Sequence, residues 1–210
     1  MTTLYRLNAN AAEIARRFDA RASAEDPWAG GTVSPRGFAP VVTAGREFIA
    51  GPRPPGESER RVIPRQWGVP PPPAAGETGR GVLTVRNPAS PFWIGNLRNA
   101  EFRCLVPATA VMEWGRVDPT TGKHRAHWFS CTDQPLFAMA GIWKDSEVPS
   151  FALLTCEPNA VWRHAGREAM PVILPGDPAV WGAWLRGDWK QAEALLAPYS
   201  SSLIHDHAGH

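Results

Sequence analysis

Short apolar segments separated by turn-forming residues dominate the middle of the chain. The segments are GVLTVRN, RCLVPATAVMEWG, HWFSCT, LFAMAGIWK, SFALLTC and MPVIL, and turn signals such as VDPTTGK and CTDQP separate most of them. Runs of this length and spacing are typical of strands in an antiparallel sheet. RVIPRQWG and the opening LYRL have the same character, and a PPPP run ends the former. The pattern therefore predicts a partly closed antiparallel β core.

Helical signals concentrate near the two ends of the chain. After LYRL, Asn8 or Asn10 is expected to cap a helix whose apolar face contains Ala11, Ile14, Ala15 and Phe18. Near the C-terminus, Asp177-Pro178 is a good N-cap and N1 pair, and Gly187 ends that helix. Trp181, Trp184 and Leu185 share its face. A last helix is expected over residues 188–197.

A chain of 210 residues is near the upper range for one domain and short for two. We therefore predict a single α+β domain over residues 1–198, with an antiparallel, barrel-like β core and peripheral helices. Residues 23–60 are rich in Pro, Gly and Ser, which indicates irregular structure with short strands. Residues 199–210 are predicted to form a flexible tail, in which three histidines are expected to be solvated.

Charge and composition narrow the function only slightly. The net charge of +2 does not by itself indicate a polyanionic partner. Arg outnumbers Lys and suits bidentate phosphate contacts, but this bias is equally typical of a GC-rich genome. No apolar run reaches eighteen residues and the N-terminus lacks a signal-peptide core, so no membrane span and a cytoplasmic location are expected.

Cysteine and tryptophan raise separate questions about the site. The cysteines Cys104, Cys131 and Cys156 lie in separate apolar runs and form no C-x-x-C pair, which predicts buried thiols without a metal or another cofactor. Among ten tryptophans, Trp67 and Trp93 border loops rich in Pro or Gly. Each either packs in the core or presents its ring to a ligand groove, where nucleobases would stack on it.

Several segments, in the right order and covering residues 1 to about 190, together resemble the SOS-response-associated peptidase (SRAP) family. They are MTTLYRL, RQWGVP, VRNPASPFW, RCLVPATAVMEWG, LFAMAGIW, LLTCEPNA and AMPVIL. The resemblance implies a domain that captures abasic sites in single-stranded DNA. In that family an N-terminal Cys, exposed when Met is removed, forms an imine with the sugar aldehyde and closes a stable ring. An Asn, a Glu and a His surround the Cys, and the peptidase name refers to self-processing.

This chain departs from the family pattern at most of those positions. Thr2 stands in place of the Cys, Thr84 in place of the Asn two residues before Arg86, and Gly166 or Arg167 in place of the His before Met-Pro-Val-Ile. His164 lies two or three residues from the expected place, and Asn87 is one step past the Arg. Glu113 is retained.

The resemblance implies Thr2 and Glu113 as the catalytic residues. A free Thr2 amine would be partly neutral near pH 7 and nucleophilic, whereas its hydroxyl closes only a readily hydrolysed ring. Glu113 is either a general acid or a buried carboxylate paired with an Arg. The implied DNA contacts are Arg86, Trp67, Gly68 and Pro35, and a surface strand residue is an equal alternative for Arg86.

Three functions stay open at this point. The chain is an SRAP enzyme that forms an imine with abasic single-stranded DNA, a catalytically silent DNA-binding module, or an interaction protein from a mobile element that kept only the fold. A serine- or metalloprotease is disfavoured because no such motif is present. If the resemblance holds, Thr2, Thr84, Glu113 and the Gly166 region converge in one cleft, and Arg86 and Trp67 line a positive groove leading to it.

Overall fold

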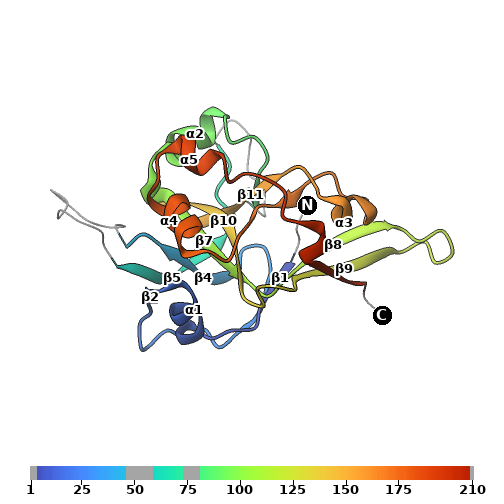
Figure 1. Cartoon of the computed structure of the whole chain (residues 1–210), viewed down its shortest axis with the longest axis horizontal. Helices are drawn as coiled ribbons and strands as arrows, with labels where there is room; N and C mark the ends of the chain where they lie inside the picture. The colour runs from blue at the N-terminus through green and yellow to red at the C-terminus, as the bar shows by residue number, and fades with distance from the viewer. Residues whose placement is uncertain (1–3, 46–58, 73–80, 209–210) are drawn as a thin grey trace.

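The computed structural model describes residues 4–45, 59–72 and 81–208, and the strands in these ranges form two sheets (Figure 1). The strands are β1 (Leu4–Leu7), β2 (Ala20–Arg21), β3 (Gly31–Val33), β4 (Phe38–Thr43), β5 (Arg60–Trp67), β6 (Thr84–Val85), β7 (Arg103–Ala108), β8 (Ala110–Val117), β9 (His124–Cys131), β10 (Phe137–Lys144), β11 (Ser150–Cys156), β12 (Met170–Pro171), β13 (Ile173–Leu174) and β14 (Ile204–Ala208). The helices are α1 (Ala11–Phe18), α2 (Pro91–Arg98), α3 (Ala160–His164), α4 (Pro178–Arg186) and α5 (Trp189–Glu193), with 3-10 turns at Ala100–Phe102 and Ser201–Leu203.

The smaller sheet has the strand order β14-β9-β8-β1-β3, and every pairing in it is antiparallel. Its longest feature is the β8–β9 hairpin, which projects from the body of the molecule in Figure 1. Tyr5 and Leu7 of β1 are fully buried, whereas Arg6 between them is exposed. This period-two alternation gives the sheet one face toward the core and one toward solvent.

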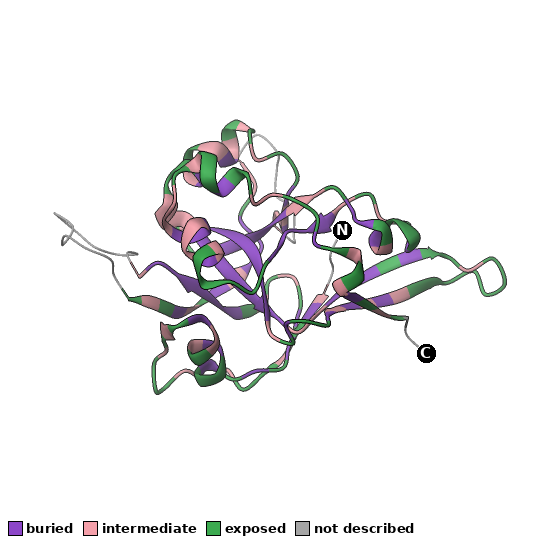
Figure 2. Ribbon diagram, viewed as in Figure 1, coloured by how far each residue is buried: buried purple, intermediate pink, exposed green. Residues whose placement is uncertain are grey.

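The larger sheet follows the order β12-β11-β10-β7-β4-β5-β2, with β13 paired to β10 and β6 paired to β11. A short parallel pairing of β11 with β5, through Ser150↔Gln66 and Phe151↔Trp67, connects two strands that are separated by β10, β7 and β4 in this order. The sheet therefore curves until these two strands meet. The predicted α+β class with a mostly antiparallel, curved core is therefore confirmed, although the sheet is not a strict barrel. Figure 2 shows these strands largely in the buried colour and the tip of the β8–β9 hairpin exposed.

Helices cover the larger sheet from both sides, with α1 against β5 and β2, α4 against β7, and α2 against β10. Asn10 and Glu13 form the capping box of α1, and Asp177 caps α4 by accepting from the amide of Ala179, as the sequence predicts. Trp181, Trp184 and Leu185 are buried. Helix α5 ends at Glu193, earlier than expected, and α2 and α3 are not predicted by the sequence pattern.

A buried arginine ties the larger sheet to these helices. Arg103 opens β7 with no exposed surface, donates to the carbonyl of Gly187 at the end of α4, and places its guanidinium 5.7 Å from the centroid of the Trp184 ring. Burial lowers the pKa of Arg103 to about 10, which still leaves it charged at neutral pH. The stacked, hydrogen-bonded cation fixes the end of α4 against β7.

The prediction of a flexible C-terminal tail is wrong for the described part of that segment. Residues Ile204–Ala208 form β14 and pair with β9 from Cys131 to His127. Tyr199, which precedes the strand, donates to Asp133 at 2.6 Å and accepts from Gln134 at 2.8 Å. The sequence signal for this strand is weak, because the segment is short and most of its residues are polar. The segment becomes a strand because the otherwise open edge of β9 supplies its pairing partner.

The expectation that Trp67 or Trp93 faces a ligand groove is also wrong. Trp67 has no exposed surface and Trp93 is 5% exposed. The Trp67 ring lies edge-on to Tyr5 at 5.3 Å, and its indole N–H donates to the carbonyl of Leu83 at 3.1 Å. Because that bond satisfies the polar atom, the whole indole can be buried. Trp67 thus supports the segment that leads into β6.

Replacement of Trp67 should therefore change stability. We expect Trp67→Ala to lower the free energy of unfolding by about 3–5 kcal/mol, because it leaves a cavity in the core where the indole was. Trp114→Ala is the matched control, since Trp114 is 44% exposed and surface changes usually cost less than about 0.5 kcal/mol. Urea unfolding followed by circular dichroism measures both, and equal losses would contradict the core assignment of Trp67.

Candidate functional site

A cleft of about 260 Å³ lies where distant parts of the chain meet. It is lined by Thr84, Arg86, Glu113, Thr155, Gly166, Arg167, Glu168, Ala169 and Met170. These residues come from β6, β8, β11, the segment after α3, and β12. The lining contains two arginines and two glutamates, so the cleft suits a polar ligand.

One wall of the cleft depends on β11. The two-residue strand β6 pairs with Leu153 and Leu154 in parallel, and the Thr155 hydroxyl donates to the carbonyl of Val85 at 2.9 Å. A strand this short has little stability of its own, so these bonds to β11 place it. They bring Thr84 to the cleft and leave the Arg86 side chain exposed beside it.

The opposite wall is formed where α3 ends. Gly166 has φ +80°, and the amides of Gly166 and Arg167 donate back to the carbonyls of Arg163 and Trp162. A Cβ on Gly166 would also lie 2.7 Å from Cγ of Arg116. Glycine is favoured here for both reasons, because only glycine adopts this conformation without strain. The resulting turn directs Arg167 back toward β8.

Glu113 and Arg167 form the central contact of the cleft. The Nε atom of Arg167 lies 3.1 Å from Oε2 of Glu113, as an ion pair without the alignment of a good hydrogen bond. The Glu113 side chain is 2% exposed and that of Arg167 23%. Arg167 also donates to the carbonyl of Trp114 at 3.1 Å. A carboxylate so far from water needs a compensating cation, and Arg167 supplies it.

The structure brings together most of the residues that the sequence places at one site. Thr84, Glu113 and the Gly166 region line the same cleft, which confirms their predicted convergence, and Arg86 lies beside them. Thr2 lies outside the described residues. The strand β1 begins at Leu4, which pairs with Met112, the residue immediately before Glu113.

The other predicted DNA contacts gather away from the cleft lining. Gly68 is buried with φ +124° and donates to the carbonyl of Phe151 at 2.9 Å. Pro35 is half-buried in the turn before β4, where the next residue, Arg36, donates its amide to the carbonyl of Trp67 at 2.8 Å. Because Trp67 is buried, Arg86 and Trp67 do not line a common groove.

The alternative of Glu113 as a buried carboxylate paired with an Arg is confirmed. The sequence treated Arg167 only as a departure from a motif and did not identify it as that partner, because a Glu in an apolar strand segment requires a cation but does not specify which one. Thr155 and Glu168 were missed as well. They carry no pattern that distinguishes them from ordinary strand-end and loop residues.

The cysteines offer no reactive thiol to the cleft. Cys104 and Cys131 are buried, as predicted, and Cys156 is half-buried. Burial, helped by the neighbouring Glu157, raises the pKa of Cys156 to about 12, and burial beside Asp133 does the same for Cys131. Within residues 4–45, 59–72 and 81–208, no three His, Cys, Asp or Glu side chains cluster as metal ligands. The described helices are too short or too polar to cross a membrane.

A comparison with family models identifies one family, and a comparison with solved structures finds the same fold. A family model described as "SOS response associated peptidase (SRAP)" matches residues 1–208. A solved structure from Bordetella bronchiseptica is similar at 23% identity, with 99% of each chain covered and a TM-score of 0.73. A structure from Bacteroides thetaiotaomicron has 18% identity, covers 98% of this chain and 91% of its own, and has a TM-score of 0.75.

A phage-related protein from Bordetella bronchiseptica has 15% identity, 99% and 93% coverage of this chain and of its own, and a TM-score of 0.69. At these identities the structural matches establish the fold alone. A comparison with curated proteins finds no match.

The Glu113–Arg167 pair makes a testable contribution to stability. Arg167→Met should lower the free energy of unfolding at pH 7 by about 2 kcal/mol, because it leaves a buried carboxylate without its cation. The lone Glu113 would then have a folded-state pKa above its unfolded value, so the deficit should shrink as the pH falls toward 5 and the carboxyl takes up a proton. Urea unfolding between pH 4.5 and 7.5 measures it.

The double variant Glu113→Gln/Arg167→Met serves as the control, because it removes both charges and should lose the pH dependence. A deficit for Arg167→Met that is constant across this pH range would contradict the ion-pair assignment.

Proposed function

Since the chain belongs to the SOS response associated peptidase (SRAP) family, we propose that it binds single-stranded DNA at abasic sites through the cleft around Glu113. We further propose that the Thr2 amine, freed by removal of Met1, forms a reversible imine with the open-chain sugar. The observation that carries the proposal is the convergence of Thr84, Arg86, Glu113 and the Gly166–Arg167 turn on one cleft. Membership of the family supports an association with DNA damage.

The charge distribution of the cleft suits a phosphodiester chain. Arg86 is exposed at its edge and directly follows β6, which β11 holds in place, so its guanidinium is available to a phosphate. Arg167 reaches the interior, where Glu113 already compensates most of its charge. Arg86 therefore supplies the contact to the phosphate backbone of the DNA, and the Glu113 end of the cleft receives the abasic sugar.

The chemistry requires an amine and a proton carrier. An α-amine with a pKa of about 7.7–8.0 is partly neutral near pH 7. Its nitrogen attacks the aldehyde carbon, and the Glu113 carboxylate accepts a proton from nitrogen and returns it to the sugar oxygen. A second transfer of this kind releases the oxygen as water, and C=N replaces C=O. The start of β1 opposite Met112 is consistent with an amine near Glu113.

Catalytically silent binding is the second candidate, and the Glu113–Arg167 pair is the observation that favours it. A carboxylate already paired at 3.1 Å is a weaker proton acceptor than a free one. Thr2 and Thr84 replace the family's Cys and Asn, which makes a durable ring unavailable. In this reading, the cleft recognises DNA without forming a bond to it.

A trapping experiment separates the two candidates. Intact mass spectrometry first establishes that Met1 is absent. Borohydride added to wild-type protein and a labelled single strand with one abasic site should then give a trapped adduct, whereas little adduct should survive heating without borohydride. Thr2→Cys should increase the heat-stable adduct, because sulfur closes a more stable ring. Glu113→Gln should slow trapping by roughly 10²-fold or more, as the proton carrier is lost.

Thr2→Leu is the matched control, since its larger side chain keeps Met1 in place and moves the amine. If wild-type protein with a free Thr2 amine gives no trapped adduct, the imine is refuted and silent binding is the remaining candidate.

DNA binding is tested separately through Arg86. Arg86→Ala should weaken binding to single strands of any sequence and reduce the slope of log K against log salt by about 0.7–1, the loss of one phosphate contact. Arg98→Ala is the control, because Arg98 is equally exposed but lies on α2 outside the cleft lining. Fluorescence anisotropy over a salt series measures both, and identical slopes for the two variants would remove Arg86 from the interface.

A further inference from the structure

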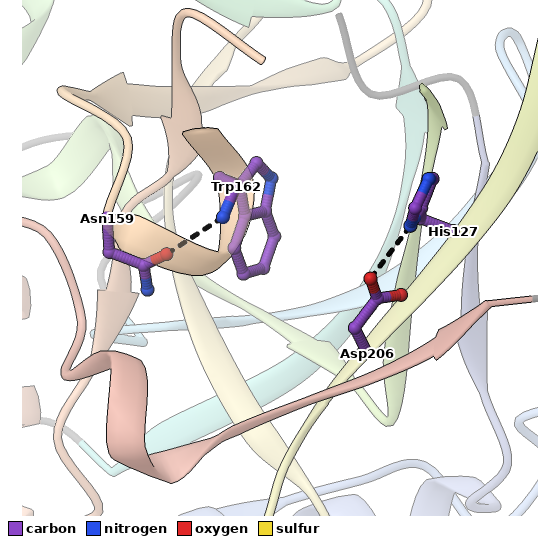
Figure 3. A network of polar contacts seen from close by, with 4 residues as sticks. All are labelled: His127, Asn159, Trp162 and Asp206. Carbon is purple, nitrogen blue, oxygen red and sulfur yellow. Dashed lines mark hydrogen bonds and ion pairs between the residues drawn. The ribbon is translucent and has the colours of Figure 1, made fainter. Parts of the chain in front are cut away.

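A histidine and a second carboxylate lie beside Glu113 on the core-facing side of the smaller sheet. Glu113 of β8 pairs in register with His127 of β9, so both side chains project from the same face. Asp206 of β14 reaches the same imidazole, and its Oδ2 lies 2.8 Å from Nδ1 of His127. Figure 3 shows the His127 and Asp206 side chains pointing toward each other. Three neighbouring strands thus contribute one ionisable group each.

The second nitrogen of His127 faces the cleft-lining segment. A Cβ added to Gly115 would lie 2.5 Å from Nε2 of His127 and 3.3 Å from the carbonyl oxygen of Ala165. Gly115 is two residues beyond Glu113 on β8, and Ala165 immediately precedes Gly166 of the cleft. The absence of a side chain at Gly115 therefore makes room for this edge of the imidazole, between β8 and the turn that carries Arg167.

Aromatic stacking holds the imidazole from its other side. The Phe129 ring stacks on His127 with the centroids 5.9 Å apart, and Trp162 stacks on Phe129 at 3.9 Å. Trp162 belongs to α3, whose N-cap Asn159 accepts from the Trp162 amide at 3.1 Å (Figure 3). The same short helix leads into Gly166 and Arg167. His127 is thus fixed by β14 on one side and by α3 on the other.

These groups have little access to water, so their charges affect one another. His127 is 8% exposed and the Asp206 side chain 21%. The other carboxylate oxygen of Asp206, Oδ1, is buried with no hydrogen-bond partner among the described residues. His127 is therefore the side chain that hydrogen-bonds the Asp206 carboxylate, through its other oxygen, Oδ2.

The elements around His127 carry other charged or titratable groups. They include Glu113 and Arg116 of β8, Arg125 of β9, Asp206 of β14, Arg163 and His164 of α3, and Arg167 after α3. Arg116, Arg125, Arg163 and His164 are exposed, and Arg167 is already paired with Glu113. Glu113 and Asp206 are therefore the groups whose interaction with His127 is least screened by water.

We propose that Glu113, His127 and Asp206 act as one coupled acid–base row, in which His127, oriented by Asp206, controls the charge balance at Glu113. With Asp206 accepting from Nδ1, the neutral ring leaves Nε2 unprotonated on the side of Gly115 and the cleft. Protonation at Nε2 adds a positive charge next to Glu113. His127 is then a positioning residue for the imine chemistry, and this part rests on the proposed function.

Nuclear magnetic resonance of the full chain with ¹⁵N-labelled histidine tests the row without DNA. In wild-type protein, neutral His127 should carry its proton on Nδ1. Glu113→Gln should lower the pH midpoint of the His127 titration by half a unit or more, because a neighbouring negative charge is lost. Asp206→Asn should lower it as well. Glu147→Gln, an exposed change in the β10–β11 loop, should leave it unchanged. A proton on Nε2 of neutral His127, or a midpoint that Glu113→Gln does not move, refutes the row.

The pH dependence of trapping tests the consequence for chemistry. The Thr2 amine gives trapping an inflection near its own pKa of about 7.7–8.0. Wild-type protein should show a second, lower inflection below about pH 7, where histidine titrates, and His127→Gln should abolish this lower inflection and keep the one of the amine. His205→Gln is the control, since His205 is an exposed residue of the same strand as Asp206, and it should keep both inflections. If His127→Gln does not fold, the isosteric Asp206→Asn should shift the lower inflection instead. A lower inflection that survives these changes refutes the role of His127. If no variant traps DNA, the proposed imine chemistry fails, and the magnetic resonance result alone decides whether the row exists.

Discussion

The burial of the Glu113 carboxylate is the constraint on which the cleft depends. A carboxylate that is 2% exposed on a central strand would be strongly destabilising without a cation, and Arg167 supplies the cation from a segment more than fifty residues away. Arg167 reaches Glu113 only because α3 stops at a glycine with positive φ. The charge on β8, the end of α3 and one wall of the cleft are therefore parts of a single arrangement.

The second wall depends on β11, which is the most connected strand of the larger sheet. It pairs with β10, β12, β5 and β6, and its parallel contact with β5 turns the sheet back on itself. Trp67 lies at this closure, between Tyr5 of the smaller sheet and Phe151 of β11, and hydrogen-bonds the residue before β6. Core packing at the closure thus determines where Thr84 and Arg86 stand.

The arrangement clarifies which parts of the family's function this chain can retain. Recognition of a phosphate needs an exposed cation held in a defined place, and Arg86 meets that requirement because it directly follows β6, which is paired with β11. Bond formation needs a proton carrier that is free to exchange its proton, and Glu113 is restrained by Arg167. His127 and Asp206 place a second source of charge on the same sheet face. Under the proposed function, the charge balance among Glu113, Arg167, His127 and Asp206 decides whether the cleft reacts with DNA or only binds it.

The sequence by itself determined the fold class, the central strands and the helices near the two ends of the chain. Short apolar runs separated by turn residues predicted the central strands, and Asn10, Asp177, Pro178 and Gly187 marked helix ends, because apolar runs, turns and caps are local properties. The ordered motifs also predicted that Thr84, Glu113 and Gly166 meet. Only the tertiary structure decided three other features, which are the burial of Trp67, the Glu113–Arg167 pair and the His127–Asp206 contact. Each joins residues far apart in the chain, and no local pattern specifies which partner a buried charge, an indole or an open strand edge will find. The same reason makes Ile204–Ala208 a strand, since β9 provides the pairing that the segment's own residues do not specify.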